Sequence, residues 1–208
     1  EARGKGDEGS RLEEILKELE AREGDGGDDA LFGGLGNDIL FGGAGNDYLV
    51  GNGFNKDGAS ATYPDHDMLF GGSGNDIIVY DKSDFIVHGG SGIDVLLAGK
   101  DAGHLSDILA KDPNKAYVAG IEVLLRAEDT THVENLGITS HETLAKYGVK
   151  IENDMLLLSA AWSLAGFNGD HRIYEFTMEN GGKLTLETTL TENEIKILPD
   201  ASVADAAG

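Results

Sequence analysis

The chain has 208 residues, of which 38 are acidic and 16 are basic, so its formal net charge is −22. This acidity argues against nucleic acids and anionic membrane surfaces as partners, because both require patches of Lys and Arg. A solvated acidic surface of the halophilic kind is the alternative explanation. There is no Cys, which excludes disulfides and thiolate metal sites. No apolar run approaches the roughly 20 residues that span a bilayer, so no membrane insertion is expected. No N-terminal signal peptide is recognisable, and we expect the chain to be a piece of a longer polypeptide.

Residues 10–23 are predicted to form an amphipathic helix that ends before Gly24. Ser10 and Glu13 have the spacing of a capping box. Four aliphatic residues share one helix face, namely Leu12, Ile15, Leu16 and Leu19. Because a helix at the mouth of a repeat array usually covers its open end, we expect an N-terminal helical cap. A helix that binds a partner is the alternative.

Residues 24–97 repeat with a nine-residue period. The units are built on the pattern Gly-Gly-x-Gly-x-Asp-x-aliphatic-x, as in residues 33–41 and 42–50. The eighth position is aliphatic in seven units: Leu31, Leu40, Leu49, Leu69, Ile78, Val87 and Leu96. This regularity indicates a repeat architecture. It argues against a flexible low-complexity linker, which is the alternative for such Gly-rich sequence.

Two units depart from the pattern. The fourth begins at Gly51 and reaches its Asp only at Asp67, so it contains an insertion. The sixth, residues 80–88, has lost its glycines and carries Phe85 at the Asp position.

Each unit is predicted to be a turn followed by a short strand. Glycine suits the turn because it allows positive φ and close backbone approach. Alternation along the strand places the eighth position inward and its neighbours outward. Two units form one coil, and neighbouring coils stack at about 4.8 Å, the spacing of paired strands. The Asp residues of every second unit should therefore lie above one another.

Stacked carboxylates repel one another, and turn carbonyls require partners. A hard divalent cation with about six to eight oxygen ligands meets both needs. Calcium is favoured over magnesium because magnesium holds its waters and takes few protein ligands. The absence of sulfur and imidazole from the donor set argues against zinc and copper. The expected fold class is thus mainly β, a parallel β-roll that binds several calcium ions. The candidate metal ligands are Asp29, Asp38, Asp47, Asp67, Asp76, Asp94, Gly27, Gly33, Gly36, Gly42, Gly45, Gly71, Gly74 and Gly92.

The two edges of the roll are expected to differ. One edge has four intact turns and should hold three ions between them; its acids are Asp29, Asp47, Asp76 and Asp94. The other edge has Asp38 and Asp67 and should hold fewer, although Asp57 and Asp65 of the insertion are candidates for rebuilding a site. Because the aliphatic core is thin, we expect the roll to be largely unfolded without calcium and to fold cooperatively with it.

Residues 98–198 are predicted to form a small α+β terminal domain, and residues 199–208 a flexible tail. The predicted elements are a strand over 116–125, a short helix opened by Thr139 and Glu142, an apolar segment over 153–159 and a hairpin that turns at 180–182.

The repeated pattern resembles the repeats-in-toxin (RTX) family of bacterial proteins over residues 24–97. The resemblance implies a parallel β-roll that binds calcium through the sixth-position Asp and turn carbonyls. It also implies export through the type I secretion machinery, directed by an uncleaved C-terminal signal, and hence a secreted or cell-surface, extracellular location. Low calcium would keep the chain unfolded for export, and extracellular calcium would fold it.

Residues 89–125 are similar to the segment that follows the roll in large bacterial biofilm and surface adhesins. The resemblance favours the C-terminal part of an adhesin, with an extracellular ligand bound by upstream domains. The alternative is an accessory module of a secreted enzyme, such as an epimerase, protease or lipase, or of a toxin.

No catalytic residues are predicted, so the chain is not expected to be an enzyme. Residues 71–75 miss the spacing of a nucleophile elbow by one residue. His141 and Glu142 lack the second His of a zinc protease, and the six His residues are scattered singly along the sequence.

Overall fold

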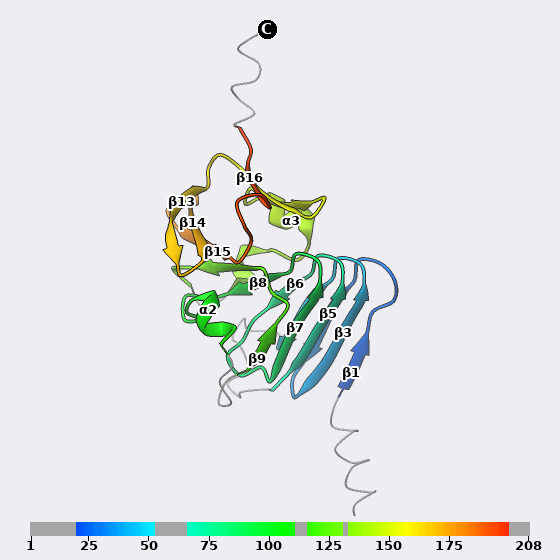
Figure 1. Ribbon diagram of the computed structural model, residues 1–208. Helices are drawn as coiled ribbons and strands as arrows, with labels where there is room; N and C mark the ends of the chain where they lie inside the picture. Colours follow the sequence, from blue (N-terminus) through cyan, green and yellow to red (C-terminus); the bar gives the residue numbers. More distant parts are fainter. Residues whose placement is uncertain (1–19, 53–65, 111–115, 131–132, 200–208) are drawn as a thin grey trace, which may run out of the picture.

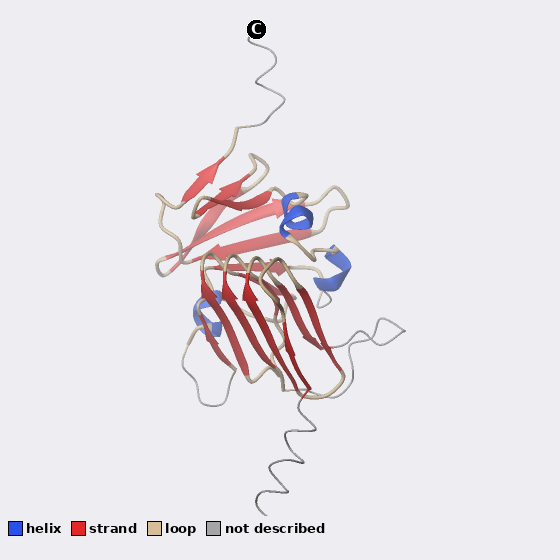
Figure 2. Cartoon of the chain, turned by 90° about the vertical axis from the view of Figure 1, so that its right-hand side faces the viewer, coloured by secondary structure: helices blue, strands red, loops and turns tan. Residues whose placement is uncertain are grey.

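The computed structural model describes residues 20–52, 66–110, 116–130 and 133–199. Strands make up about half of the described residues, and the helices are short (Figures 1 and 2). The strands form three sheets. Within the described residues, no helix is long and apolar enough to cross a membrane.

The first sheet has five strands that all run parallel (Figure 1). In spatial order these are β1 (Glu20–Glu23), β3 (Asp38–Ala44), β5 (Met68–Ser73), β7 (Ile86–Ser91) and β9 (Tyr117–Ala119). Every strand that intervenes in the sequence belongs to the second sheet. The chain therefore passes back and forth between two parallel sheets, which is consistent with the expected β-roll.

The second sheet has eight strands. Its parallel half consists of β2 (Ala30–Gly34), β4 (Tyr48–Asn52), β6 (Ile77–Val79), β8 (Val95–Ala98) and β10 (Val123–Ala127). Its antiparallel half consists of β15 (Lys183–Thr188), β14 (His171–Thr177) and β13 (Ser163–Asn168). Because β10 pairs with both β8 and β15, one sheet runs from the repeats into the C-terminal region.

The expected N-terminal helical cap is not supported. Residues 20–23, predicted as the last turn of the helix, are instead strand β1, with Glu20 opposite Asp38 and Glu23 opposite Phe41. The exposed edge of β3 offers backbone groups that a strand can satisfy. This pairing outweighs the helix propensity of Glu, Ala and Arg, because tertiary context overrides local propensity. Residues 10–19, which contain the predicted capping box and apolar stripe, lie outside the described residues.

The eighth position of each unit points into the roll, as predicted. Six of these residues are fully buried and Leu31 is half-buried; the buried residues are Leu40, Leu49, Leu69, Ile78, Val87 and Leu96. On the second sheet the neighbouring positions are buried as well, as at Tyr48 and Val95, because the C-terminal region packs against that face. The predicted outward positions are therefore exposed mainly on the first sheet, where Phe41 stacks on Phe70.

The single strand expected over residues 116–125 is two strands on opposite sheets. Gly120 separates β9 from β10 and has a φ of 61°. The chain thus makes one more coil after residue 97, with a turn whose sequence lacks the repeat pattern. The boundary expected between residues 97 and 98 does not interrupt either sheet.

The remaining C-terminal elements cover the second sheet. They are η1 (Val133–Leu136), α3 (His141–Ala145), β11 (Val149–Glu152), β12 (Met155–Leu158) and β16 (Ile195–Ile197). Helix α3 begins at Ser140, whose hydroxyl accepts from the N–H of Thr143, so the cap lies one residue after the predicted Thr139. The predicted hairpin is present as the antiparallel pair β14 and β15.

Helix α2 (Leu105–Ile108) closes the C-terminal end of the roll (Figure 1). Leu105 and Ile108 are buried and belong to the same apolar cluster as Leu96 and Leu124. The roll therefore has a helical cap at the end opposite the predicted one.

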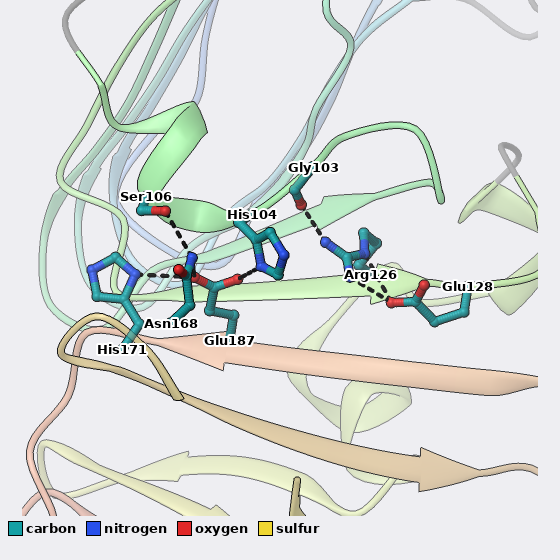
Figure 3. A network of polar contacts seen from close by, with 8 residues as sticks. All are labelled: Gly103, His104, Ser106, Arg126, Glu128, Asn168, His171 and Glu187. Carbon is teal, nitrogen blue, oxygen red and sulfur yellow. Dashed lines mark hydrogen bonds and ion pairs between the residues drawn. The ribbon is translucent and has the colours of Figure 1, made fainter. Parts of the chain in front are cut away.

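A buried carboxylate fastens this cap (Figure 3). Nδ1 of His104 lies 2.9 Å from Oε2 of Glu187, and Nδ1 of His171 lies 3.1 Å from Oε1. Asn168 donates to both Glu187 and Ser106. Burial raises the pKa of Glu187, but the hydrogen bonds from His104, Asn168 and His171 outweigh it and hold that pKa below its ordinary value. The sequence offered no sign that these two His residues meet, because their partner lies on a distant strand.

We predict that Leu105→Ala lowers the free energy of unfolding by about 2–4 kcal/mol, since it leaves a cavity at the closed end of the roll. Chemical denaturation in saturating calcium measures this change. Leu164→Ala, at a position that is 52% exposed, is the control and should change stability by less than about 0.5 kcal/mol. Equal effects of the two substitutions would contradict a capping role for α2.

Candidate metal centre

Four Asp residues form a ladder along one edge of the roll. The backbone N–H of Asp29 donates to Oδ1 of Asp47, that of Asp47 to Oδ1 of Asp76, and that of Asp76 to Oδ1 of Asp94, each at 2.8 Å. The predicted stacking is therefore present on the edge where four acids were expected. The carboxylates do not simply face one another, since one oxygen of Asp47, Asp76 and Asp94 is bound by the preceding coil.

The second carboxylate oxygen of each of these residues lacks a hydrogen-bond partner. Oδ2 of Asp29, Asp47, Asp76 and Asp94 is buried and makes no hydrogen bond. Asp76 and Asp94 have no exposed surface at all. No ion pair in the described structure joins any of the four to a Lys, Arg or His side chain. A buried anionic oxygen without a partner is costly, so this edge favours a cation.

Backbone carbonyls converge on the same oxygens. A Cβ added to Gly42 would collide with Oδ2 of Asp47 and with the carbonyl oxygen of Gly71 in the next coil. The same pair of contacts recurs at Gly71, with Asp76 and Gly89. The first glycine of a unit thus leaves room where a carboxylate oxygen and a carbonyl oxygen approach each other from neighbouring coils.

The predicted glycines divide into two groups. Gly33, Gly42 and Gly71 are first glycines, each beside the Oδ2 of the Asp in its own unit. The fourth-position glycines have φ between 102° and 137°, which other residues rarely adopt, and these are Gly36, Gly45, Gly74 and Gly92. Gly27 lacks positive φ, but its carbonyl approaches Gly45 in the next coil.

The prediction omitted three glycines in the first position. Gly24, Gly51 and Gly89 each lie beside the Oδ2 of the Asp in their own unit, namely Asp29, Asp67 and Asp94. Their phase in the nine-residue period was the signal that could have found them.

Three acids of the ladder have raised pKa values. Burial raises the pKa of Asp76 from 3.8 to about 6 and that of Asp94 to about 8. A hydrogen bond from the preceding coil lowers each value in part, and the charges of neighbouring acids raise it again. The pKa of Asp47 is also raised, first by burial and then by Asp29 and Asp28. Without a metal, these carboxylates therefore bind protons at a higher pH than an ordinary Asp does.

The opposite edge is shorter. The N–H of Asp38 donates to Oδ1 of Asp67 at 2.8 Å, and both residues are buried. In the next coil Phe85 stands at the Asp position, and its N–H donates to the carbonyl of Asp67. The predicted candidates Asp57 and Asp65 lie outside the described residues.

Asp84, one position before Phe85, is a buried acid that the repeat alignment missed. Burial raises its pKa well above the ordinary value, and Asp67 and Asp81 raise it further, although a hydrogen bond from Asp81 lowers it in part. Its carboxylate accepts the N–H of Asp81, so it closes a local turn.

A second ladder lies next to the Asp ladder and was not predicted. Oδ1 of Asp28 accepts the N–H of Asn46, Oδ1 of Asn46 accepts that of Asn75, and Oδ1 of Asn75 accepts that of Ile93. The recurrence of Asn at the fifth position was the available signal. This ladder needs no metal, and it fixes the register of the turns.

The arrangement fits calcium better than a side-chain metal site. No cluster of three or more His, Cys, Asp or Glu side chains suited to a metal occurs among the described residues. Each coil instead brings one Asp together with backbone carbonyls, an all-oxygen donor set suited to a hard ion. When bound, calcium would supply the positive charge that the buried Oδ2 atoms lack.

The family model for the RTX calcium-binding nonapeptide repeat matches residues 23–55 and 63–82, in four copies. The chain therefore carries RTX repeats, and the match supports the family resemblance over this region. It does not extend past residue 82. Searches of curated proteins and of solved structures gave no match.

We predict that, without calcium, folding becomes more favourable as the pH falls from 9 to 5. The folded-state pKa values of Asp94 (about 8) and Asp76 (about 6) exceed the ordinary 3.8, so the folded chain binds protons that the unfolded chain has released. Protons should also compete with calcium, so the calcium midpoint of folding should rise over the same interval. Circular dichroism in chelator and in calcium measures both effects, and a calcium-free stability that rises with pH would refute the first.

Proposed function

We propose that the chain is a calcium-dependent folding module of a secreted protein. The observation that carries the proposal is the row of buried Oδ2 atoms on Asp29, Asp47, Asp76 and Asp94, which make no hydrogen bond. The match to RTX calcium-binding repeats supports calcium as the ion. The sites would be formed by these acids and the turn carbonyls, with a further site at Asp38 and Asp67 on the opposite edge.

The ion would act on folding because its sites exist only between stacked coils. In the unfolded chain the acids are solvated and far apart, so binding free energy becomes folding free energy. The apolar interior of the roll is a single row of aliphatic residues per sheet. With four acids on one edge, this thin core favours a chain that folds when the cation is supplied.

We further propose that the switch serves export. A chain with a net charge of −22 repels itself and stays extended where calcium is scarce. Sites of about 10⁻⁴–10⁻³ M affinity, typical of extracellular modules, would fill only outside the cell. Passage through the type I secretion machinery, followed by folding at the cell surface or in the medium, fits this dependence.

Of the possible parent proteins, we favour a large surface adhesin. The support is the similarity of residues 89–125 to the segment that follows the roll in such adhesins. In the structure the described residues of this segment belong to the last two coils, β7 with β8 and β9 with β10, and to α2, which lies between β8 and β9 in the sequence. The sequence upstream distinguishes the candidates: tandem binding domains support the adhesin, and a catalytic domain supports a secreted enzyme or toxin.

We predict that Asp47→Asn with Asp76→Asn raises the calcium midpoint of folding by about tenfold or more, since changes to ligand surroundings already cost that much at other metal sites. Asn keeps the oxygen that accepts the backbone N–H, so the ladder remains while two charges are lost. Asp38→Asn should have a smaller effect, and the exposed Asp170→Asn should have none. Calcium titration followed by circular dichroism measures the midpoints. A wild-type signal that stays unchanged from chelator to millimolar calcium would sink the proposal.

A glycine substitution tests the same site without changing charge. Gly42→Ala places a methyl group against Oδ2 of Asp47 and the carbonyl of Gly71, so we expect a clear rise in the calcium midpoint. Gly26→Ala is the matched control, since its added methyl group meets nothing within 4 Å. If both variants folded at the wild-type calcium concentration, the carbonyl and carboxylate oxygens would not be acting together.

A further inference from the structure

The Asp ladder continues beyond the last repeat. The N–H of Asp94 donates to Oε2 of Glu122 at 3.0 Å, in the same way that the N–H of Asp76 donates to Oδ1 of Asp94. Val95 pairs with Val123, so Glu122 directly precedes the strand that follows β8 in the sheet. Glu122 thus stands where a fifth Asp would stand, in a segment without the nonapeptide pattern.

The carbonyl side of the arrangement continues as well. A Cβ on Gly89 would collide with Oδ2 of Asp94 and with the carbonyl oxygen of Gly120. The same relation joins Gly71 to Asp76 and Gly89 one coil earlier. Gly120 therefore takes the place of the first glycine of a repeat, although its own sequence context differs.

A shortened turn explains why this position holds Glu. Residues 90–93 separate Gly89 from Asp94, whereas only Ile121 separates Gly120 from Glu122. The shorter turn holds the backbone differently, and the additional methylene of Glu lets its carboxylate reach the N–H of Asp94.

The space between Asp94 and Glu122 resembles the repeat sites, because a buried carboxylate oxygen there lacks a partner. Asp94 is fully buried, and its Oδ2 makes no hydrogen bond. Neither acid forms an ion pair with a Lys, Arg or His in the described part of the chain. Two carboxylates and a carbonyl oxygen therefore meet at the C-terminal end of the edge.

We propose that Asp94, Glu122 and the carbonyl of Gly120 hold one further calcium ion, at the junction of the repeats and the terminal sheet. This inference rests on the proposed calcium function of the repeats and adds a site outside the nonapeptide sequence. The carbonyl of Glu122 accepts from the hydroxyl of Thr188 at 2.8 Å and from the N–H of Thr189 at 3.0 Å. An ion at Glu122 therefore connects calcium binding to the end of β15.

Glu122→Gln is the direct test, because Gln keeps the size and the acceptor for the Asp94 N–H while removing the charge. Equilibrium dialysis with calcium alone should show one ion fewer per chain than the wild type. Thr188→Val removes the hydroxyl contact with the Glu122 carbonyl but leaves the carboxylate, and Glu152→Gln changes an exposed acid; both should bind the full number. An unchanged number in Glu122→Gln overturns the junction site while leaving the repeat sites intact. A wild-type chain that binds no calcium overturns both.

A crystal structure of the wild-type chain grown in calcium tests the site without relying on a variant that folds. An ion bound by both Asp94 and Glu122 supports the proposal. Ions along the repeats with none at this step would overturn it, whatever the behaviour of Glu122→Gln.

Discussion

Buried carboxylates with one oxygen engaged and one oxygen without a hydrogen bond determine the behaviour of this protein. The engaged oxygen accepts a backbone N–H from the preceding coil, which fixes the position of each Asp. That fixed position prevents the second oxygen from turning toward water, so the charge cannot be relieved by rotation. The backbone thus sets up a requirement that only a cation or a proton can meet.

Two groups of contacts connect this edge to the rest of the chain. Nε2 of His141 in α3 lies 2.5 Å from the carbonyl oxygen of Asn75, in the turn just before Asp76. Glu122 contacts the end of β15 through its carbonyl. The shared second sheet adds a continuous hydrogen-bond network from β2 to β13. A structural change at the turns of the acidic edge therefore affects elements outside the repeats, namely α3 and β15.

The nine-residue period was enough to predict a mainly β fold consistent with a roll, its inward aliphatic residues and the two acidic edges, because each depends on local spacing. The features that were missed depend on distant partners. The edge of β3 makes residues 20–23 a strand. Gly120 divides an apolar run that resembles one strand. Glu122 joins the ladder only because β10 lies beside β8, and Glu187 gathers two His residues from separate loops. A sequence pattern within one segment does not specify contacts with residues that lie far away in the chain.

The two ends of the roll are unlike. At the C-terminal end, α2 and the antiparallel strands close the core, whereas β1 and β2 are the outermost strands of their sheets in the described part of the chain. Phe32 of β2 is 42% exposed, and Leu31 is only half-buried. An edge strand of a sheet offers backbone groups to a further strand, and no described strand pairs with the outer edges of β1 and β2. The stack therefore has a polarity: additional coils could be added only at the N-terminal face, each templated by the one before it, so the array can lengthen upstream without altering its closed end.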